Sequence, residues 1–305
     1  MSNALRNWIL SASLALAAAL LPQASIAQSN DAGLSPTLAT IKKTKVVRLG
    51  FRESSLPLSF LDKSDRPIGY SLELCQAIVD EIGVEVDEAE LKIKYVKVTP
   101  ETRIPDLLQN RIDLECGSTT ANAERAKRVA FSPLIFVAGA KLMVAKASAI
   151  SSITDLRGKT IVVTKGTTNE QALQAADAKF KLGLKIVTAD DHEQSYKMLS
   201  EQKVDAFATD DILLYGLIAQ HKAQDKFRVT GDYLSYEPYG IMFRKNEPQM
   251  AQVVERSFRK LATNHDLVPL YNKWFVARLP TGERLGIPIS PQLEESFKVL
   301  DDSGG

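Results

Sequence analysis

The sequence predicts an α/β protein made of two doubly wound units, and three features lead to that prediction. Apolar runs of strand length alternate with segments of helical periodicity from about residue 46 onward. The 305 residues, 45% of them hydrophobic and 25% charged, are enough for about two globular domains. The alternation starts again after residue 138, which indicates a second unit of the same kind.

The first unit begins with an apolar strand, "VVRLGF", at residues 46–51. Residues 69–83 have apolar side chains at helical spacing, and Gly83 is a typical helix C-cap residue. Residues 91–98 alternate as a half-buried strand does, and "TRIPDLLQNRIDLECG" predicts a short helix and a strand. The resulting order of strand, helix, strand, helix, strand is that of a doubly wound sheet.

The second unit has its strands at "KTIVV", "LKIVTA" and "VDAFATD", and a helix follows each of them. The extended segments 138–146 and 236–244 lie on either side of this unit. If both segments cross between the units, the second unit is inserted into the first, and the two crossings form a hinge. Helical segments after residue 247 then complete the first unit.

The N-terminal segment predicts export from the cytoplasm. Fourteen uncharged residues follow Arg6, and the small residues Ser25 and Ala27 form a cleavage site. Because fourteen residues are too few to span a bilayer comfortably, we predict a signal peptide over residues 1–27 and a soluble exported protein. An uncleaved membrane anchor is the alternative.

The overall charge and the cysteine and histidine positions exclude several functions. The formal net charge of +1 gives no basis for binding nucleic acid or acidic membranes. The three histidines are scattered along the chain, so we expect no metal site and no cofactor. Cys75, on a predicted helix, and Cys116, at a strand end, could form a disulfide in an oxidising compartment or serve as small core hydrophobes.

The stretch "ECGSTTANAERAKR", residues 115–128, is the first candidate site. It follows a strand and leads into a predicted helix, and ligands of open α/β sheets bind beyond the carboxyl ends of strands. The hydroxyls of Ser118 and Thr120 and a helix N-terminus favour an anion, and Arg125 can bind a carboxylate through two hydrogen bonds. The alternative is an ordinary helix cap beside a solvent-facing arginine.

A second turn of the same kind occurs in the other unit. In "IVVTKGTTNEQAL" a strand leads through Thr164, Thr167 and Thr168 into a helix, without the lysine pattern of a nucleotide-binding loop. Asp210 ends the strand "VDAFATD", where its carboxylate could pair with an ammonium group or cap the next helix. Two turns with similar chemistry on different units favour a ligand held between them.

The segments "GFRESSLPLSF", "ECGSTTANAER", "LRGKTIVVTKGTT" and "VDAFATDD" resemble the periplasmic amino-acid-binding proteins of ABC transporters. The resemblance covers roughly residues 40–290 and is strongest to the glutamate/aspartate-binding branch. It implies a type II periplasmic binding protein fold, with two lobes joined by two crossover strands. Such a protein binds L-glutamate or L-aspartate between closing lobes in the periplasm and delivers it to a membrane permease.

With this fold, the expected organisation of the chain can be given in full. The expected parts are a signal peptide (1–27), a flexible leader (28–39), lobe 1 (40–138 and 242–290), lobe 2 (139–241) and a C-terminal tail (291–305). We expect a monomer.

The resemblance also implies roles for single residues. The positions that match the family's ligand contacts, together with Thr164 of the second turn, are Arg52, Arg103, Ser118, Thr120, Arg125, Thr164, Thr168, His192 and Asp210. In the family pattern, Arg125 and Thr168 bind the ligand's α-carboxylate, with Ser118 and Thr120 in support. Asp210 matches the residue that binds the α-ammonium.

Two further arginines are implied for the side-chain carboxylate of an acidic ligand. They match Arg52 and Arg103, and His192 matches a histidine that faces the same carboxylate. One position departs from the pattern: Pro100 stands where the branch often has a serine, and proline offers neither a hydroxyl nor an N–H. Thr102 is the nearest replacement for the missing donor.

The implied charges fit a dicarboxylic amino acid. Three arginines against Asp210 give the site an expected excess of about two positive charges, or more if His192 is protonated, and the ligand carries a net charge of −1. The neutral glutamine should therefore bind more weakly.

The main alternative function is an exported cyclohexadienyl or arogenate dehydratase on the same fold, since a fold does not determine a function. Such an enzyme needs a general acid, for which Glu53, Asp210 and His192 are the candidates. Three arginines are better explained by holding a diacid than by eliminating water from it, so we expect no enzyme activity. The sensor module of a receptor or of a lytic transglycosylase is a third class, and it would require a further span or a catalytic domain.

Overall fold

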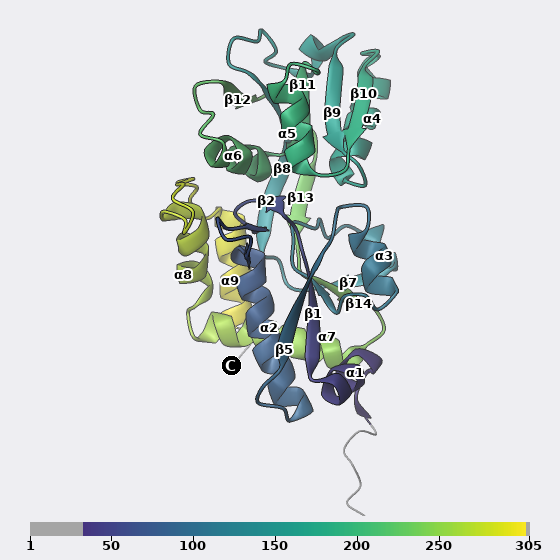
Figure 1. Ribbon diagram of the computed structural model, residues 1–305, viewed down its shortest axis with the longest axis vertical. Coiled ribbons are helices and arrows are strands. Elements are labelled where there is room, and N and C mark those ends of the chain that lie inside the picture. Colours follow the sequence, from purple (N-terminus) through teal and green to yellow (C-terminus); the bar gives the residue numbers. More distant parts are fainter. Residues whose placement is uncertain (1–32, 303–305) are drawn as a thin grey trace, which may run out of the picture. The chain divides into compact units, whose positions relative to one another are not determined.

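The computed structural model describes residues 33–302 (Figure 1). The predicted signal peptide, residues 1–27, lies outside the described residues, as does the predicted leader up to residue 32. No helix within residues 33–302 has both the length and the apolar character needed to cross a membrane.

Lobe 1 is built on a five-stranded mixed sheet with the strand order β5-β1-β6-β14-β7. The strands β5, β1 and β6 are parallel, and β14 runs antiparallel to both of its neighbours. The strands are β1 (Val46–Phe51), β5 (Lys92–Lys97), β6 (Leu114–Glu115), β7 (Val129–Phe131) and β14 (Met242–Arg244), with a small sheet of β2 (Ser54–Ser55), β3 (Ser59–Leu61) and β4 (Pro67–Ile68). The helices are α1 (Pro36–Thr44), α2 (Tyr70–Val86), α3 (Arg103–Leu108), α7 (Pro248–Thr263), α8 (Leu267–Tyr271) and α9 (Pro291–Asp302), with a π-helical turn at Asn272–Val276.

Helices cover both faces of this sheet. Val47 and Leu49 of β1 belong to a large core that includes side chains of α1, α2, α7 and α9. A smaller core on Leu107 of α3 lies against Val129 and Met242. Because each face of the sheet buries apolar side chains, lobe 1 is a doubly wound unit, as predicted.

Lobe 2 has its own sheet, with the order β10-β9-β11-β8-β12. The strands β10, β9 and β11 are parallel, and β8 is antiparallel to β11 and β12. Its elements are β8 (Phe136–Ala145), β9 (Thr160–Thr164), β10 (Lys185–Ala189), β11 (Ala206–Asp210), β12 (Phe227–Thr230), α4 (Thr168–Phe180), α5 (His192–Ser200), α6 (Asp211–Gln220) and a 3₁₀ turn at Ile153–Leu156.

Alternation along the strands explains why this sheet also has two cores. On β11, Phe207 packs with side chains of α5 and α6, while its neighbours Ala206 and Ala208 pack with Leu173 of α4. Successive side chains of a strand point to opposite faces, so one apolar strand supplies both layers.

Two strands connect the lobes. The long strand β8 pairs antiparallel with β13 (Tyr236–Tyr239), and Figure 1 shows both running between the two sheets. The lobe boundary predicted at residue 138 lies within β8, and the one predicted at 241 lies between β13 and β14. The lobes also touch directly, because a Cβ added to Gly216 of α6 would lie only 2.2 Å from the carbonyl oxygen of Leu56, in the loop after β2.

Several expectations from the sequence are wrong in the described part of the chain. Gly83 does not end its helix, because α2 continues to Val86 and its C-cap is Asp87. Residues 36–39 are not a flexible leader, because they begin α1, where Leu38 is fully buried. Residues 291–302 are not a tail, because Leu293 and Phe297 bury one face of α9. The stretch after Thr120 does not enter an α-helix, because it forms only a three-residue 3₁₀ turn, Arg125–Lys127, before β7 begins.

Candidate functional site

Most of the residues singled out in the sequence lie where strands end and helices begin. In lobe 1, Arg52 follows β1, Arg103 begins α3, and Ser118 and Thr120 follow β6. In lobe 2, the corresponding positions at the ends of β9 and β11 and at the starts of α4 and α5 are Thr164, Asp210, Thr168 and His192. This is the edge at which open α/β sheets bind ligands.

Arg52 is a buried charge whose terminal nitrogens have no partner. The residue is 1% exposed, and neither Nη1 nor Nη2 has a hydrogen-bond acceptor among the described residues. Its backbone N–H donates to Ser59 Oγ at 2.9 Å, which fixes the start of the side chain. Burial, together with the nearby charge of Arg103, lowers the pKa of Arg52 to about 9. A buried guanidinium of this kind is costly unless an anion pairs with it.

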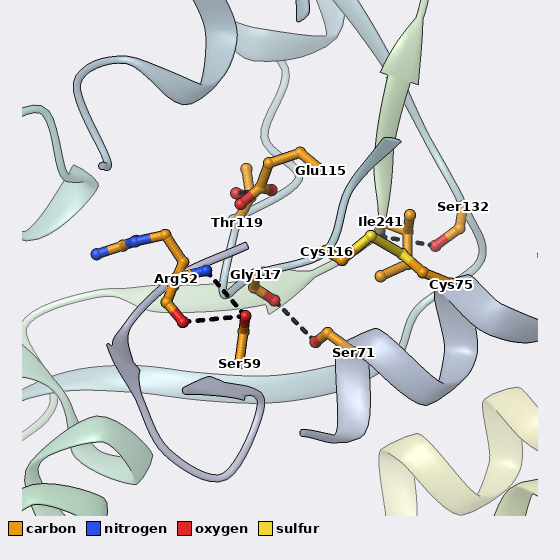
Figure 2. The surroundings of a disulfide bond; sticks show 10 residues. All are labelled: Arg52, Ser59, Ser71, Cys75, Glu115, Cys116, Gly117, Thr119, Ser132 and Ile241. Atoms are coloured by element: carbon orange, nitrogen blue, oxygen red, sulfur yellow. Dashed lines mark hydrogen bonds between the residues drawn. A yellow bond between two sulfur atoms is a disulfide. The ribbon is translucent and has the colours of Figure 1, made fainter. Parts of the chain in front are cut away.

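Gly117 makes room for this arginine. A Cβ on Gly117 would lie 2.4 Å from Glu115 Oε1 and 2.8 Å from Arg52 Cγ. The backbone here is anchored by the disulfide between Cys75 and Cys116 and by Ser71 Oγ, which donates to the Gly117 carbonyl at 2.8 Å. Figure 2 shows the Arg52 guanidinium directed away from this anchored side.

Arg103 lies beside Arg52 and is 2% exposed. Its Nη1 donates to the Ser118 carbonyl at 3.2 Å and to Thr119 Oγ1 at 2.6 Å, whereas its Nε has no partner in residues 33–302. The Thr119 hydroxyl donates in turn to Glu115. Burial is the main cause of the lowered pKa of Arg103, and the carboxylate of Glu115 opposes that shift.

Arg125 is half-buried at the mouth of the site. Its Nη1 donates to the Thr120 carbonyl at 3.0 Å, and Asn122 Oδ1 caps its backbone N–H at 2.9 Å. Burial, with a contribution from the charge of Arg103, lowers its pKa to about 10. Arg125, Arg128 and Thr168 line a depression of ≈ 160 Å³.

Asp210 is the buried carboxylate of lobe 2. It is 3% exposed and accepts a hydrogen bond from the Tyr239 hydroxyl on β13, while its Oδ1 has no partner in the described chain. Burial and the nearby carboxylate of Glu237 raise the pKa of Asp210 to about 7. An ammonium group at the free oxygen would favour the ionised form.

His192 is neutral in this arrangement. It is 1% exposed, and its Nδ1 lies 2.8 Å from Thr164 Oγ1. Burial, then the charges of Arg52 and Arg103, hold the pKa of His192 well below its ordinary value. The imidazole therefore adds no positive charge to the site near neutral pH.

Two buried carboxylates were missed in the sequence. Glu115 and Glu237 are fully buried, and both act electrostatically on Arg103 and Arg125. The expected excess of about two positive charges is therefore wrong for this structure, since three arginines face three buried carboxylates. The signals were weak, because Glu115 is the last residue of a short strand and Glu237 lies in segment 236–244, which was expected only to cross between the units.

The hydroxyls near Arg125 already have partners for their protons. Thr120 Oγ1 and Thr168 Oγ1 each donate to Glu237 Oε2 at 2.6 Å, and Ser118 Oγ donates to Ser55 Oγ at 3.3 Å. A hydroxyl has one proton and two lone pairs. Thr120 and Thr168 therefore act as acceptors toward any further group while Glu237 holds their protons.

Several buried polar atoms in this cluster have no partner within residues 33–302. They are Arg52 Nη1 and Nη2, Arg103 Nε, Glu115 Oε1, Asn169 Oδ1 and Asp210 Oδ1. Positively charged hydrogen-bond donors and negatively charged acceptors thus lie unpaired in the same cluster. This combination suits a small organic ion that carries both a positive and a negative group. The described residues contain no group of three or more His, Cys, Asp or Glu side chains placed to hold a metal ion.

Comparison with known protein sequences gives long matches. The family model of bacterial extracellular solute-binding proteins, family 3, matches residues 47–277. The L-glutamate/L-aspartate-binding protein of Pseudomonas aeruginosa is 39% identical over 285 residues, which is 93% of each chain. The glutamate/aspartate import solute-binding protein of Escherichia coli is 35% identical over 287 residues, 93% of this chain and 95% of that protein.

Solved structures of binding proteins share the fold. A mutant of ArgBP from T. maritima superposes with a TM-score of 0.70 at 27% identity, covering 78% of this chain and 98% of that one. An ancestral amino acid-binding protein, described as a precursor of cyclohexadienyl dehydratase, gives a TM-score of 0.67 at 28% identity, covering 78% and 99%. The α/β fold is thus that of the type II periplasmic binding proteins, and the chain belongs to the bacterial extracellular solute-binding proteins of family 3.

Proposed function

We propose that this solute-binding protein takes up L-glutamate, L-aspartate or both between its two lobes and delivers the amino acid to the membrane permease of an ABC importer. Relatives at 35–39% identity that cover most of the chain are named for these two amino acids. We place the protein in the periplasm as a monomer.

The observation that carries the proposal is the unpaired guanidinium of Arg52. Its two terminal nitrogens are buried, without a partner in the described chain, beside the second buried arginine, Arg103. A carboxylate accepts two parallel hydrogen bonds from a guanidinium and offsets the cost of burying it. A ligand with a side-chain carboxylate fits this requirement, and an uncharged side chain does not.

The remaining contacts follow from the charges around this pair. Asp210, with its free Oδ1, receives the ligand's α-ammonium, and Arg125 binds the α-carboxylate. Thr120 and Thr168 lie near Arg125. Their hydroxyl oxygens can only accept hydrogen bonds from the ligand while their protons are donated to Glu237. The remaining assigned contacts are Ser118, Thr164 and His192, and the neutral imidazole of His192 can donate one hydrogen bond to the side-chain carboxylate.

The dehydratase alternative is not favoured. The relatives that match most of the chain are named as glutamate/aspartate-binding proteins, two of them of import, and none of the three is named as an enzyme. Among the candidate general acids, Asp210 accepts a hydrogen bond from Tyr239 and keeps its other oxygen free for an ammonium group.

Titration calorimetry with four amino acids tests the proposal. L-Glutamate or L-aspartate should bind at least about a hundredfold more tightly than L-glutamine and L-asparagine, because an unmatched buried arginine costs about 2–5 kcal/mol. Equal affinity for glutamate and glutamine would reject an acidic ligand. Turnover of prephenate or arogenate by the same sample would restore the dehydratase.

A further inference from the structure

Glu237 lies at the junction of the two lobes, and its carboxylate is satisfied by hydroxyl groups alone. The residue is on the crossover strand β13 and is 2% exposed. Oε2 accepts hydrogen bonds from Thr120 Oγ1 and Thr168 Oγ1, each at 2.6 Å, and Oε1 accepts one from Ser235.

The two threonines belong to different lobes. Thr120 follows β6 of lobe 1, and Thr168 is the first residue of α4 in lobe 2. Their hydroxyl oxygens are 3.3 Å apart, and each donates to the same carboxylate oxygen. A single atom of the crossover strand therefore holds both lobes together, and it can do so only when the lobes are closed.

The contact of Glu237 with the two threonines is buried, unlike the ion pair that also joins the lobes. The neighbouring interlobe ion pair, Lys165 with Glu101 at 2.8 Å, is half-exposed on both sides, so solvent screening leaves it weak. Hydrogen bonds to a buried carboxylate are charge-assisted and stronger than neutral ones. Among these contacts, the carboxylate of Glu237 is the one best placed to favour closure.

We propose that Glu237 is a positioning residue that favours the closed arrangement of the lobes before ligand binds, by joining the hydroxyls of Thr120 and Thr168. The inference rests on the proposed function in one respect, because closure is what prepares the site for the amino acid. A protein that is already partly closed binds with an apparent affinity that rises with the closed fraction. Removing the carboxylate should therefore open the ligand-free protein and weaken binding, although Glu237 need not touch the ligand.

The chain contains a matched control for this test. Glu247 is also a buried glutamate that accepts from a threonine, since Thr37 Oγ1 donates to it at 2.7 Å. Both residues lie in lobe 1, Thr37 in α1 and Glu247 directly before α7. Glu247→Gln thus makes the same chemical change without affecting an interlobe contact.

The experiment is small-angle scattering of the full chain without ligand, followed by calorimetry with L-glutamate and L-aspartate. Glu237→Gln should have a larger radius of gyration than the wild type, should contract when the amino acid is added, and should bind about tenfold or more weakly. Glu247→Gln should melt at a lower temperature but keep the wild-type radius and affinity. A Glu237→Gln protein with the wild-type radius and affinity would overturn the inference.

A second variant protects the test if Glu237→Gln does not fold. Thr168→Val removes one of the two hydroxyls that Glu237 joins and leaves the carboxylate, so this variant alone should enlarge the radius of gyration of the ligand-free protein. A ligand-free Thr168→Val protein with the wild-type radius would overturn the inference. Failure of the wild type to bind either amino acid would reject the proposed function, whereas the radii of the ligand-free proteins would still decide the role of Glu237.

Discussion

Two arginines of the same strand region, Arg48 and Arg52, have opposite surroundings. Arg48 Nε and Nη2 donate to the two carboxylate oxygens of Asp113 at 2.9 and 2.6 Å, and Asp113 also accepts from Arg244 at 2.8 Å. Arg52, which directly follows the carboxyl end of the strand, has no acceptor for its terminal nitrogens in the described chain.

The difference separates charges that stabilise the fold from charges that are kept for a ligand. Removing one member of a buried pair destabilises a protein, because the other member is left unpaired. Removing a buried charge that is already unpaired should instead stabilise the folded protein. The cluster around Arg52, Arg103 and Asp210 therefore lowers the stability of the unliganded fold, whereas the cluster around Asp113 raises it.

The largest expected effect tests this contrast directly. Arg52→Met should weaken L-glutamate binding by about a hundredfold or more, because the side-chain carboxylate loses its partner, and it should raise the free energy of unfolding. Arg48→Met should lower the free energy of unfolding by about 1–3 kcal/mol and leave the affinity unchanged. Calorimetry and urea denaturation measure the two quantities. If both variants lose stability to the same degree, the contrast between the clusters is wrong.

The next largest effect comes from comparing two carboxylates, Asp210 of the site and Asp113 of the paired cluster. Asp210→Asn should weaken binding about 10–100-fold, through loss of a charge-assisted hydrogen bond to the α-ammonium, and should raise the melting temperature at pH 8. Asp113→Asn should lower the melting temperature and keep the affinity, because its carboxylate binds Arg48 and Arg244, which are not among the proposed ligand contacts. Thermal melts with and without L-glutamate separate the two outcomes. An Asp210→Asn protein that melts below the wild type would count against an unpaired carboxylate.

The smallest effect is a dependence on pH. The pKa of Asp210 is raised to about 7, and an ammonium ligand requires the ionised form. Affinity should therefore fall as the pH drops below about 7, by up to about tenfold per pH unit, and binding near pH 7 should release a proton. The stability of the ligand-free protein should change with pH in the opposite direction to the affinity, because the folded state binds more protons than the unfolded state. The free energy of unfolding should then decrease as the pH rises from about 4 to 7.

Calorimetry in two buffers of different ionisation enthalpy measures the proton release. Asp210→Asn is the control, since it should remove both the release and the slope of stability with pH. An affinity that is flat between pH 5.5 and pH 8, the interval to be titrated, would mean that Asp210 does not pair with the ligand.

Much of the fold could be predicted from periodicity. Strand and helix alternate with clear signals, and the rule that ligands bind at the carboxyl ends of strands singled out Thr120 in lobe 1 and Thr164 and Asp210 in lobe 2. Arg52 was assigned only through the family resemblance. The terminal helix α9 had a signal that was overlooked, because Leu293 and Phe297 are spaced as one face of a helix requires.

The electrostatics of the site could not be predicted in the same way. The net charge near the arginines depends on Glu115 and Glu237, which come from a short strand and from the crossover strand. Only the tertiary structure brings these carboxylates to the arginines. Likewise, the helix expected after Thr120 fails because β7 begins at Val129 and leaves room for a single tight turn.

Gly216 has a consequence for the choice of ligand. The Leu56 carbonyl oxygen lies so near this glycine that even a methyl group on α6 would collide with it. This backbone contact therefore limits how closely the lobes can approach, and it sets a lower limit on the volume between them. The smallest amino acid that both lobes can contact at once is thus governed in part by a helix position outside the ligand's own contacts.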